Sequence, residues 1–243
     1  MMTELRPDGR TVDELRPLEF ILDIQPASAG SVLIKWGRTH VICAVSIEEK
    51  VPHHRIDSGG GWITAEYAML PGSSAHRVKR ARDGVRGRTA EIQRLIGRSL
   101  RACFDLDAIG PRTIRVDCDV LNADGGTRCA SITGAYVAVS IALQRHFAAT
   151  GHPPPTSTPL TAVSIGVVDG RVVTDLCYAE DHIADVDLNF VAVGSGIVEI
   201  QGTAEGAFFT QDQLMTMVQY GQQACTRISE RQLAVLDKLE SDR

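Results

Sequence analysis

The stretch DCDVLNADGGTRCASITGAYVA, residues 117–138, joins a strand to an apolar helix through a glycine-rich turn. Thr113–Leu121 (TIRVDCDVL) alternates polar and apolar residues, which predicts a strand. Ser131–Phe147 is rich in alanine, valine and isoleucine, and it predicts a long helix that is mostly buried. The succession of strand, tight turn and buried helix indicates a domain built from layers of strands and helices.

The residues on the N-terminal side of this stretch are mainly β. Segments rich in valine and isoleucine are separated by turn residues such as Gly37-Arg38. A helix is predicted from Thr89 to about Cys103, because its apolar residues recur with the helical period. Strands are predicted at Leu18–Ile24, Ser31–Trp36, His40–Ile47 and Trp62–Met69.

The residues on the C-terminal side repeat the pattern after a Pro-rich segment, GHPPPTSTP (151–159), the best candidate linker. A final amphipathic helix is predicted over about Thr210–Lys238. Runs of strands followed by long helices predict an α+β fold, with one domain over residues 1–243 and pseudo-equivalent halves of about 1–150 and 160–243. The strands of the second half are predicted at Ala162–Val168, Arg171–Asp175, Ala184–Val193 and Val198–Gln201.

The composition excludes several classes of protein. Of 243 residues, 44% are apolar and 23% charged, close to globular averages, which excludes disorder, collagen and coiled coils. No window of about 18 uncharged apolar residues exists, so we expect no membrane helix and no membrane partner. The charged N-terminus, MMTELRPDGR, does not resemble a signal peptide. Six scattered cysteines without a CxxC pair predict reduced core thiols in a cytoplasmic protein.

The charge of the chain is distributed unevenly. The net charge is −5, yet His76–Arg101 holds nine Lys or Arg against Asp83 and Glu91. This segment therefore carries +7 and the remainder −12. A basic stripe on an acidic protein indicates binding to a polyanion.

The turn Asp124–Arg128 is a candidate anion site. Free N–H groups and the positive end of the dipole attract anions to a helix N-terminus. Two glycines allow close approach of the backbone, Thr127 supplies a hydroxyl and Arg128 a bidentate guanidinium. A capped strand-to-helix turn with no ligand is an equally good interpretation of these residues alone. Neither GxGxxG nor GxxxxGK[ST] is matched, so a nucleoside triphosphate site of those types is not supported.

A second cluster is acidic. On an extended segment, Asp185 and Asp187 project to one face, and Asp181 reaches the same face. Oxygen ligands of this kind suit Mg²⁺ or Mn²⁺. The alternative, a solvated acidic strand, is less favoured because the residues interleaved with the aspartates are apolar. His182 is expected to face solvent.

The third feature is a basic loop, residues 76–88. It ends on Arg88 at a helix start, where an arginine joins the helix end in binding an anion. A solvated charged surface is the alternative interpretation of such a run. We call the turn Asp124–Arg128 the phosphate turn. This turn, the carboxylates and the basic loop together predict metal-assisted phosphoryl or nucleotidyl transfer on a nucleic acid.

Five stretches resemble the bacterial ribonuclease PH family, in order and over about residues 6–230. They are GWITAEYAMLP (61–71), GRTAEIQRLIGRSLRA (87–102), DCDVLNADGGTRCASITGAYVA (117–138), DLCYAEDHIADVDLN (175–189) and VEIQGTAEG (198–206).

This resemblance implies a phosphate-dependent 3′→5′ exoribonuclease that trims the 3′ ends of tRNA precursors and other RNAs. Inorganic phosphate, the co-substrate, attacks the terminal phosphodiester and a nucleoside 5′-diphosphate leaves, reversibly. The family fold is α+β, with two pseudo-equivalent β-α halves, mixed sheets and long helices. Its subunits assemble into a homohexamer, a trimer of dimers.

The resemblance also implies roles for individual residues. Phosphate binding falls on Arg88, Gly126, Thr127 and Arg128. Catalysis falls on Asp181 and Asp187, which with Asp185 are the expected metal ligands. Contact with tRNA falls on the loop residues Arg77, Lys79, Arg80 and Arg82.

The chain departs from the family pattern in several places. Gly72 stands where an arginine is frequent, His182 stands where a serine is common, and the loop from Pro71 to Arg88 is about two residues short. These differences leave the phosphate residues in place and bear on the exact tRNA contacts and on the rate.

Two other functions are compatible with the same motifs. A non-catalytic RNA-binding subunit of an exosome-like ring is the alternative from a different class, but such subunits lose the arginines or aspartates that this chain keeps. Half of a polynucleotide phosphorylase is disfavoured, because 243 residues cannot hold two such cores and RNA-binding domains. An active phosphorolytic exoribonuclease is therefore the favoured hypothesis.

Overall fold

The first half of the protein is built on a five-stranded mixed sheet. The computed structural model describes residues 6–80, 87–205 and 207–241. The strand order is β1-β2-β3-β5-β4; neighbouring strands are antiparallel except β4, which runs parallel to β5. The strands are β1 (Leu18–Leu22), β2 (Gly30–Trp36), β3 (Thr39–Glu48), β4 (Trp62–Met69) and β5 (Thr113–Asn122).

The second half is built on a four-stranded antiparallel sheet, in the order β7-β6-β8-β9. β6 is buried from Leu160 to Val167, because helices pack on both of its faces. β9, by contrast, is largely exposed. The strands are β6 (Leu160–Val168), β7 (Arg171–Thr174), β8 (Val186–Val193) and β9 (Gly196–Ala204).

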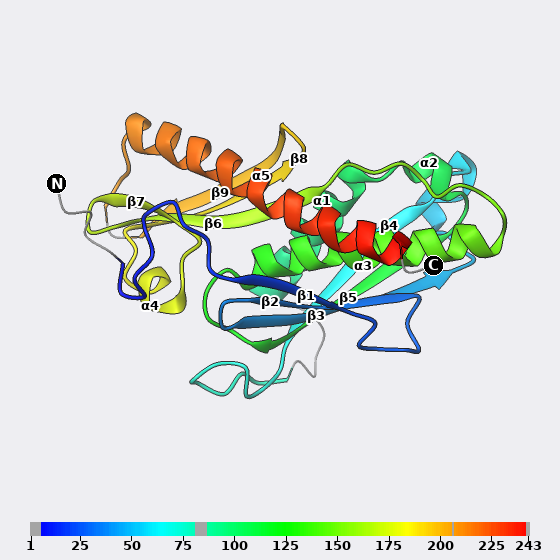
Figure 1. Ribbon diagram of the computed structural model, residues 1–243, viewed down its shortest axis with the longest axis horizontal. Helices are drawn as coiled ribbons and strands as arrows, with labels where there is room; N and C mark the ends of the chain where they lie inside the picture. The colour runs from blue at the N-terminus through cyan, green and yellow to red at the C-terminus, as the bar shows by residue number, and fades with distance from the viewer. Residues whose placement is uncertain (1–5, 81–86, 206, 242–243) are drawn as a thin grey trace.

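Three long helices separate and cover the sheets (Figure 1). α1 (Arg88–Cys103) packs on β4, and α3 (Thr127–Ala149) lies between β2 and β3 on one side and β6 on the other. α5 (Gln211–Ser241) runs along the length of the molecule and packs on β6, β7 and β8. The short helices are η1 (His53–Ser58), α2 (Leu106–Ile109) and α4 (Tyr178–Asp181).

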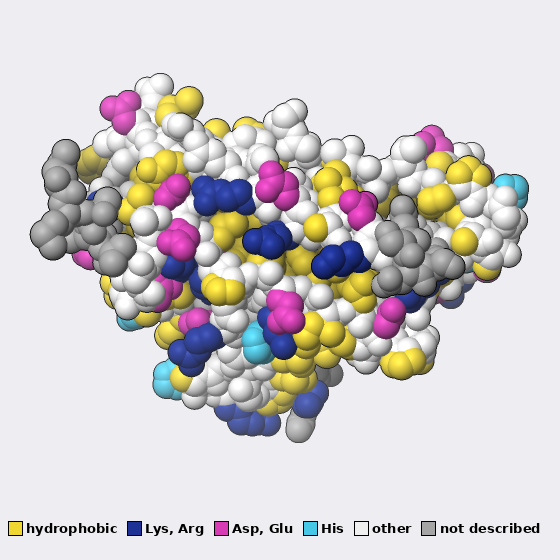
Figure 2. All heavy atoms as spheres, viewed as in Figure 1, with side chains coloured by type: hydrophobic (Ala, Val, Ile, Leu, Met, Phe, Trp, Pro, Cys, Tyr) yellow, Lys and Arg dark blue, Asp and Glu magenta, His cyan; other side chains and the backbone are white. Residues whose placement is uncertain are grey.

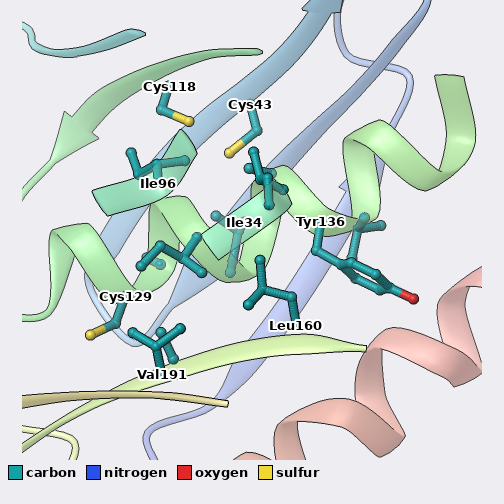
Figure 3. Close-up of a cluster of buried hydrophobic side chains, with 14 of the residues drawn as sticks. Ile34, Cys43, Ile96, Cys118, Cys129, Tyr136, Leu160 and Val191 are labelled. Atoms are coloured by element: carbon teal, nitrogen blue, oxygen red, sulfur yellow. The ribbon is translucent and has the colours of Figure 1, made fainter. Parts of the chain in front are cut away.

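One hydrophobic core joins the two sheets. Side chains of β2, β3 and α1 meet the α3 side chains on one face of that helix, and Leu160 and Val191 meet them on the other (Figure 3). All six cysteines are free and five are buried, which confirms the prediction of reduced core thiols. The continuous core explains why α3 carries apolar side chains all round.

The predicted α+β fold is confirmed, and every predicted strand and long helix is present. Two boundaries differ in a way that matters for the site. α3 begins at Thr127 rather than near Ser131, so Thr127 and Arg128 belong to its first turn. The expectation that residues 181–187 are extended is wrong before Val186, because α4 and a turn place Asp181 off the strand. Among the described helices, none is long and apolar enough to span a membrane.

Close packing of α3 on the first sheet generates a stability prediction. A Cβ at Gly134 would lie 2.9 Å from both Cys43 Sγ and Ile34 Cγ2, in the middle of the core. Gly134→Ala should therefore lower the free energy of unfolding by about 1–3 kcal/mol, the usual effect of overpacking. Urea denaturation would measure it.

Gly97 of α1 provides the matched control. Its added Cβ would meet Arg101 Nη1 at 2.9 Å, the movable end of a long side chain. Gly97→Ala should leave stability unchanged or raise it by up to about 1 kcal/mol, because alanine is the better helix former. If both variants gained stability, the close contact of α3 with β2 and β3 would be wrong.

Candidate active site

The conformation of the turn before α3 is fixed by hydrogen bonds to Thr39. The Thr39 hydroxyl donates to the Gly125 carbonyl at 2.7 Å and accepts from the Asp124 N–H at 3.0 Å. Gly125 and Gly126 have φ of 77° and 63°, a left-handed conformation that glycine adopts without strain. A side chain on Gly125 would also collide with the Leu176 carbonyl. The two glycines thus bring the N-terminus of α3 against residues 176–178.

A cavity of about 330 Å³ opens at this helix N-terminus. Its wall contains both arginines and both aspartates to which the sequence assigned phosphate binding and catalysis, although these come from four different elements. The sequence-predicted residues on the wall are Arg88, Gly126, Thr127, Arg128, Asp181 and Asp187. Two cationic groups, free helix N–H groups and two carboxylates therefore face one small space.

Arg128 is oriented by side chains from two other elements. Its Nη1 donates to Glu91 Oε1 of α1 at 3.4 Å and to Gln201 Oε1 of β9 at 3.2 Å. Gln201 Nε2 donates to the same Glu91 oxygen at 3.0 Å, which closes a small network. Only 12% of the Arg128 side chain is exposed, so its guanidinium is largely preordered. Arg88, in contrast, is exposed at the first residue of α1.

The two aspartates influence each other electrostatically. Burial and then the negative charge of Asp181 raise the pKa of Asp187 to about 6, against an opposing effect of the arginines. Burial also raises the pKa of Asp181, while Arg88 and Arg128 lower it. Glu205 raises both pKa values, so a third carboxylate lies within electrostatic reach. The cavity thus holds a carboxyl group whose pKa is raised well above the usual range of an aspartate.

The cavity offers two carboxylates as oxygen ligands for a divalent cation. No group of three or more His, Cys, Asp or Glu is arranged to hold a metal within the part of the chain that the structure describes. Mg²⁺, however, is usually bound by one or two carboxylates together with substrate phosphates and water. Asp181 and Asp187 fit that description. Asp185 lies just before β8 and is not among the residues lining the cavity.

The loop after β4 carries three of the predicted RNA contacts. Arg77, Lys79 and Arg80 are exposed, and Arg82 lies outside the described residues. The start of the loop is fixed by the Ala123 N–H, which donates to the Ser73 carbonyl at 2.7 Å. Figure 2 shows Lys and Arg side chains on the protruding lower edge, where Figure 1 draws this loop. The loop that carries these cations therefore begins at the cavity wall, which includes Met69 and Ser74.

A buried ionic network behind the cavity was not found by sequence reasoning. Asp175 is 1% exposed and accepts hydrogen bonds from Arg16 Nη2 at 2.6 Å and Trp36 Nε1 at 2.9 Å. Arg6 donates to both carboxylate oxygens of Glu180 at 2.6 Å. These residues connect the N-terminal segment to α4, which carries Asp181.

Other residues of the site were also not predicted from the sequence. Tyr67 Oη lies 2.9 Å from Thr127 Oγ1, and the Cys129 thiol donates to Asn189 Oδ1 at 3.3 Å. Glu91, Gln201 and Glu205 lie within motifs already quoted, but nothing in their spacing indicates what they contact. The cavity wall further includes Met69, Ser74, Ser164, Tyr178 and Asn189.

Comparison with known proteins gives one consistent result. The model described as 3′ exoribonuclease family, domain 1, matches residues 14–143, and domain 2 of the same family matches residues 158–224. The chain is 48% identical to the ribonuclease PH of Corynebacterium kroppenstedtii over 239 residues, covering 96% of this chain and 94% of the relative. It is 52% identical to that of Mycolicibacterium gilvum over 238 residues, covering 96% and 91%.

Solved structures with a similar fold are more distant in sequence. Rice (Oryza sativa) Rrp46 superposes with a TM-score of 0.76 at 20% identity, covering 95% of this chain and all of the other. A subunit of the Archaeoglobus fulgidus exosome with RNA bound to its active site gives a TM-score of 0.75 at 21% identity, covering 94% and 92%. At this identity the likeness shows the fold alone.

The pKa of Asp187 generates a pH prediction. The folded-state pKa of about 6 exceeds the ordinary value of 3.8, so the folded protein favours the protonated carboxyl. The contribution of this group to stability is therefore present at low pH and is lost as pH rises from about 4 to above 6. Asp187→Asn, which does not titrate, should stabilise the protein relative to wild type at about pH 8 more than at about pH 4.

Between these two pH values, the difference in free energy of unfolding between Asp187→Asn and wild type should change by about 1–3 kcal/mol, since one pKa unit corresponds to about 1.4 kcal/mol. Urea denaturation at both pH values, in EDTA and without phosphate, would measure it. A difference that is independent of pH would contradict the burial of the Asp187 carboxyl beside Asp181.

Proposed function

The chain belongs to the 3′ exoribonuclease family and is a phosphorolytic exoribonuclease of the ribonuclease PH type, and we propose that the cavity at the N-terminus of α3 is its active site. RNA ending in a free 3′ nucleotide is the substrate, and tRNA precursors are the proposed physiological class. One observation carries the proposal: Arg88, Arg128 and the helix N-terminus converge on the same 330 Å³ as Asp181 and Asp187.

The arginine side of the cavity binds the attacking phosphate. Arg128, held by Glu91 and Gln201, offers a preordered guanidinium, and Arg88 supplies a second positive charge. The N–H groups at Gly126 and Thr127 complete the cradle, as helix N-termini do for anions. A phosphate oxygen held there is aimed at the phosphorus of the terminal phosphodiester.

The carboxylate side handles the leaving group. Attack forms a bond from the phosphate oxygen to the terminal phosphorus and breaks the bond from that phosphorus to the 3′ oxygen of the preceding nucleotide. The products are a nucleoside 5′-diphosphate and an RNA shorter by one residue. Asp187, with its pKa of about 6, is suited to deliver a proton to the departing 3′ oxygen.

A divalent cation fits the same carboxylates. Asp181 and, in its ionised form, Asp187 would hold Mg²⁺ or Mn²⁺, which when bound neutralises charge on the phosphate oxygens. The metal role expected for Asp185 stays a prediction, and the proposal rests on the two lining aspartates.

The basic loop guides RNA to the cavity. Arg77, Lys79 and Arg80 are exposed where they can contact backbone phosphates, which position RNA without reading its sequence. The same role is proposed for Arg82, outside the described residues. The alternative of a non-catalytic ring subunit has less support, because the likeness to exosome subunits is limited to 20–21% identity.

We also propose a homohexamer, a trimer of dimers, working in the cytoplasm. Six free thiols suit a reducing compartment. Large apolar side chains are exposed on and after the outer strand β9, among them Ile197, Ile200 and Phe208 at 49%, 41% and 90%. Closed symmetric assembly buries such surfaces. Light scattering should give six times the subunit mass, and a stable, fully active monomer would contradict assembly.

The reaction is tested by its products. A short RNA incubated with Mg²⁺ and labelled inorganic phosphate should release nucleoside diphosphates that carry the label, and EDTA should stop the release. Asp187→Asn should remain folded and react about 10²-fold more slowly or worse, the usual scale for acid–base roles. Nucleoside monophosphates without label would indicate hydrolysis and overturn the proposal.

The assignment of phosphate and RNA contacts is tested by a pair of variants. Arg128→Ala should raise the KM for phosphate at least about tenfold and change RNA affinity little, because it removes one charge-assisted contact. Lys79→Ala should leave the KM for phosphate unchanged, weaken RNA binding and reduce the salt dependence of binding by about one phosphate contact. Equal losses of both affinities in Arg128→Ala would show that Arg128 contacts RNA.

A further inference from the structure

An aromatic side chain stands exposed at the edge of the proposed active site. Tyr178, the first residue of α4, is 54% exposed although it lines the cavity. The ring also lines a neighbouring cavity of about 640 Å³, so it stands where the two cavities meet. The wall of the second cavity includes Arg38 and the loop residues 72–76. An extended ligand leaving the first cavity toward the loop passes this ring.

The ring is part of an ordered pair. The rings of Tyr178 and His182 stack with centroids 5.4 Å apart and an interplanar angle of 16°. His182 Nδ1 lies 3.0 Å from the Tyr178 carbonyl oxygen, and since a carbonyl only accepts, Nδ1 donates this hydrogen bond. The Tyr178 N–H donates to Asp124 Oδ1 of the phosphate turn at 3.3 Å. Binding on this pair therefore orders few additional side chains.

The position of the Tyr178–His182 pair relative to the proposed catalytic residue Asp181 is fixed by α4. Asp181 lies three residues after Tyr178 in the same helical turn, about 5 Å along the axis. The helix is itself fixed through Glu180, which is 2% exposed and bonded to Arg6. A base stacked on Tyr178 would be held in register with the carboxylate beside the scissile bond.

The surroundings favour a nucleotide over an apolar ligand. Arg38 is exposed on the adjoining cavity, and Arg77, Lys79 and Arg80 extend along the same loop. Proteins bind single-stranded nucleic acids with exposed aromatic rings beside cationic side chains. The rings stack on the faces of the bases, and the cations attract the phosphates of the backbone.

We propose that Tyr178, backed by His182, forms a stacking platform for a base near the 3′ end of the RNA, on the path from the active site to the basic loop. The proposal rests on the proposed function of the same cavity. Stacking is tolerant of base identity, so the platform contributes affinity and register without strong sequence preference. The stacked imidazole of His182 gives the platform a second ring.

The platform is tested with abasic RNA. Oligonucleotides with one abasic site at each of the last four positions would be compared with the intact oligonucleotide by fluorescence anisotropy, without phosphate. Wild type should lose affinity by about 5- to 100-fold at one position, the range expected for one stacked base. Tyr178→Leu should lose a similar factor on intact RNA and nothing further when that position is abasic, the coupling expected of two groups in contact.

Further variants separate stacking from other roles. Tyr178→Trp should keep affinity within a few-fold, and the indole it introduces should be quenched by RNA. His182→Ser should weaken binding less than Tyr178→Leu. The KM for phosphate should be unchanged in all three. Leu233→Ala, at a 44% exposed position on α5, is the control for loss of an exposed apolar side chain and should bind like wild type.

The outcomes distinguish the platform from the proposed function. Failure of wild type to release nucleoside diphosphates would overturn the function itself. With wild type active, three results would overturn only the platform. They are wild-type affinity in Tyr178→Leu, equal losses on intact and abasic RNA at every position, and loss of the assembled state in Tyr178→Leu. The last result would mean that the Tyr178 side chain packs against a second copy of the chain.

Discussion

The carboxylate of Asp175 is the point on which the active-site region depends. It is almost completely buried, with φ of 58°, at the end of β7. Such a group is tolerated only when hydrogen-bond donors surround it. Arg16 supplies its backbone N–H at 2.7 Å and its guanidinium at 2.6 Å, and Trp36 supplies Nε1 at 2.9 Å. Since Arg16 also donates to the Asp124 carbonyl, one arginine fixes the distance between the phosphate turn and the segment that leads to α4.

This arrangement explains why the site lies where the two sheets meet. The phosphate turn extends from β5 of the first sheet, and Asp187 belongs to β8 of the second. α3 and the shared core hold the sheets together, but apolar packing alone does not specify the orientation of a polar turn. The buried ion pairs do so, because their geometry is directional. The Arg6–Glu180 pair extends the same constraint to α4 and therefore to Asp181 and Tyr178.

The sequence predicted the elements that carry strong periodic patterns, and the family resemblance identified six of the residues that line the cavity. Strands such as Trp62–Met69 and the helix from Thr89 had local signals. The short α4 had none, since its single turn depends on the Arg6–Glu180 pair, 174 positions apart, in addition to its own capping box between Cys177 and Glu180. Asp175 and Arg16, separated by 159 positions, likewise carry no local signature. The contacts of Arg128 with Glu91 and Gln201 depend on the placement of α1 and β9 and were inaccessible to spacing arguments for the same reason.

The role of Asp175 is tested most directly by the phosphate KM of an Asp175→Asn variant. Asparagine keeps the shape but leaves Arg16 buried without its counter-charge, which should lower the free energy of unfolding by about 3–5 kcal/mol. At a temperature where circular dichroism shows the variant still folded, the account predicts that the KM for phosphate rises at least about tenfold, while RNA binding by the basic loop changes little. A folded Asp175→Asn variant with the wild-type KM for phosphate would contradict it.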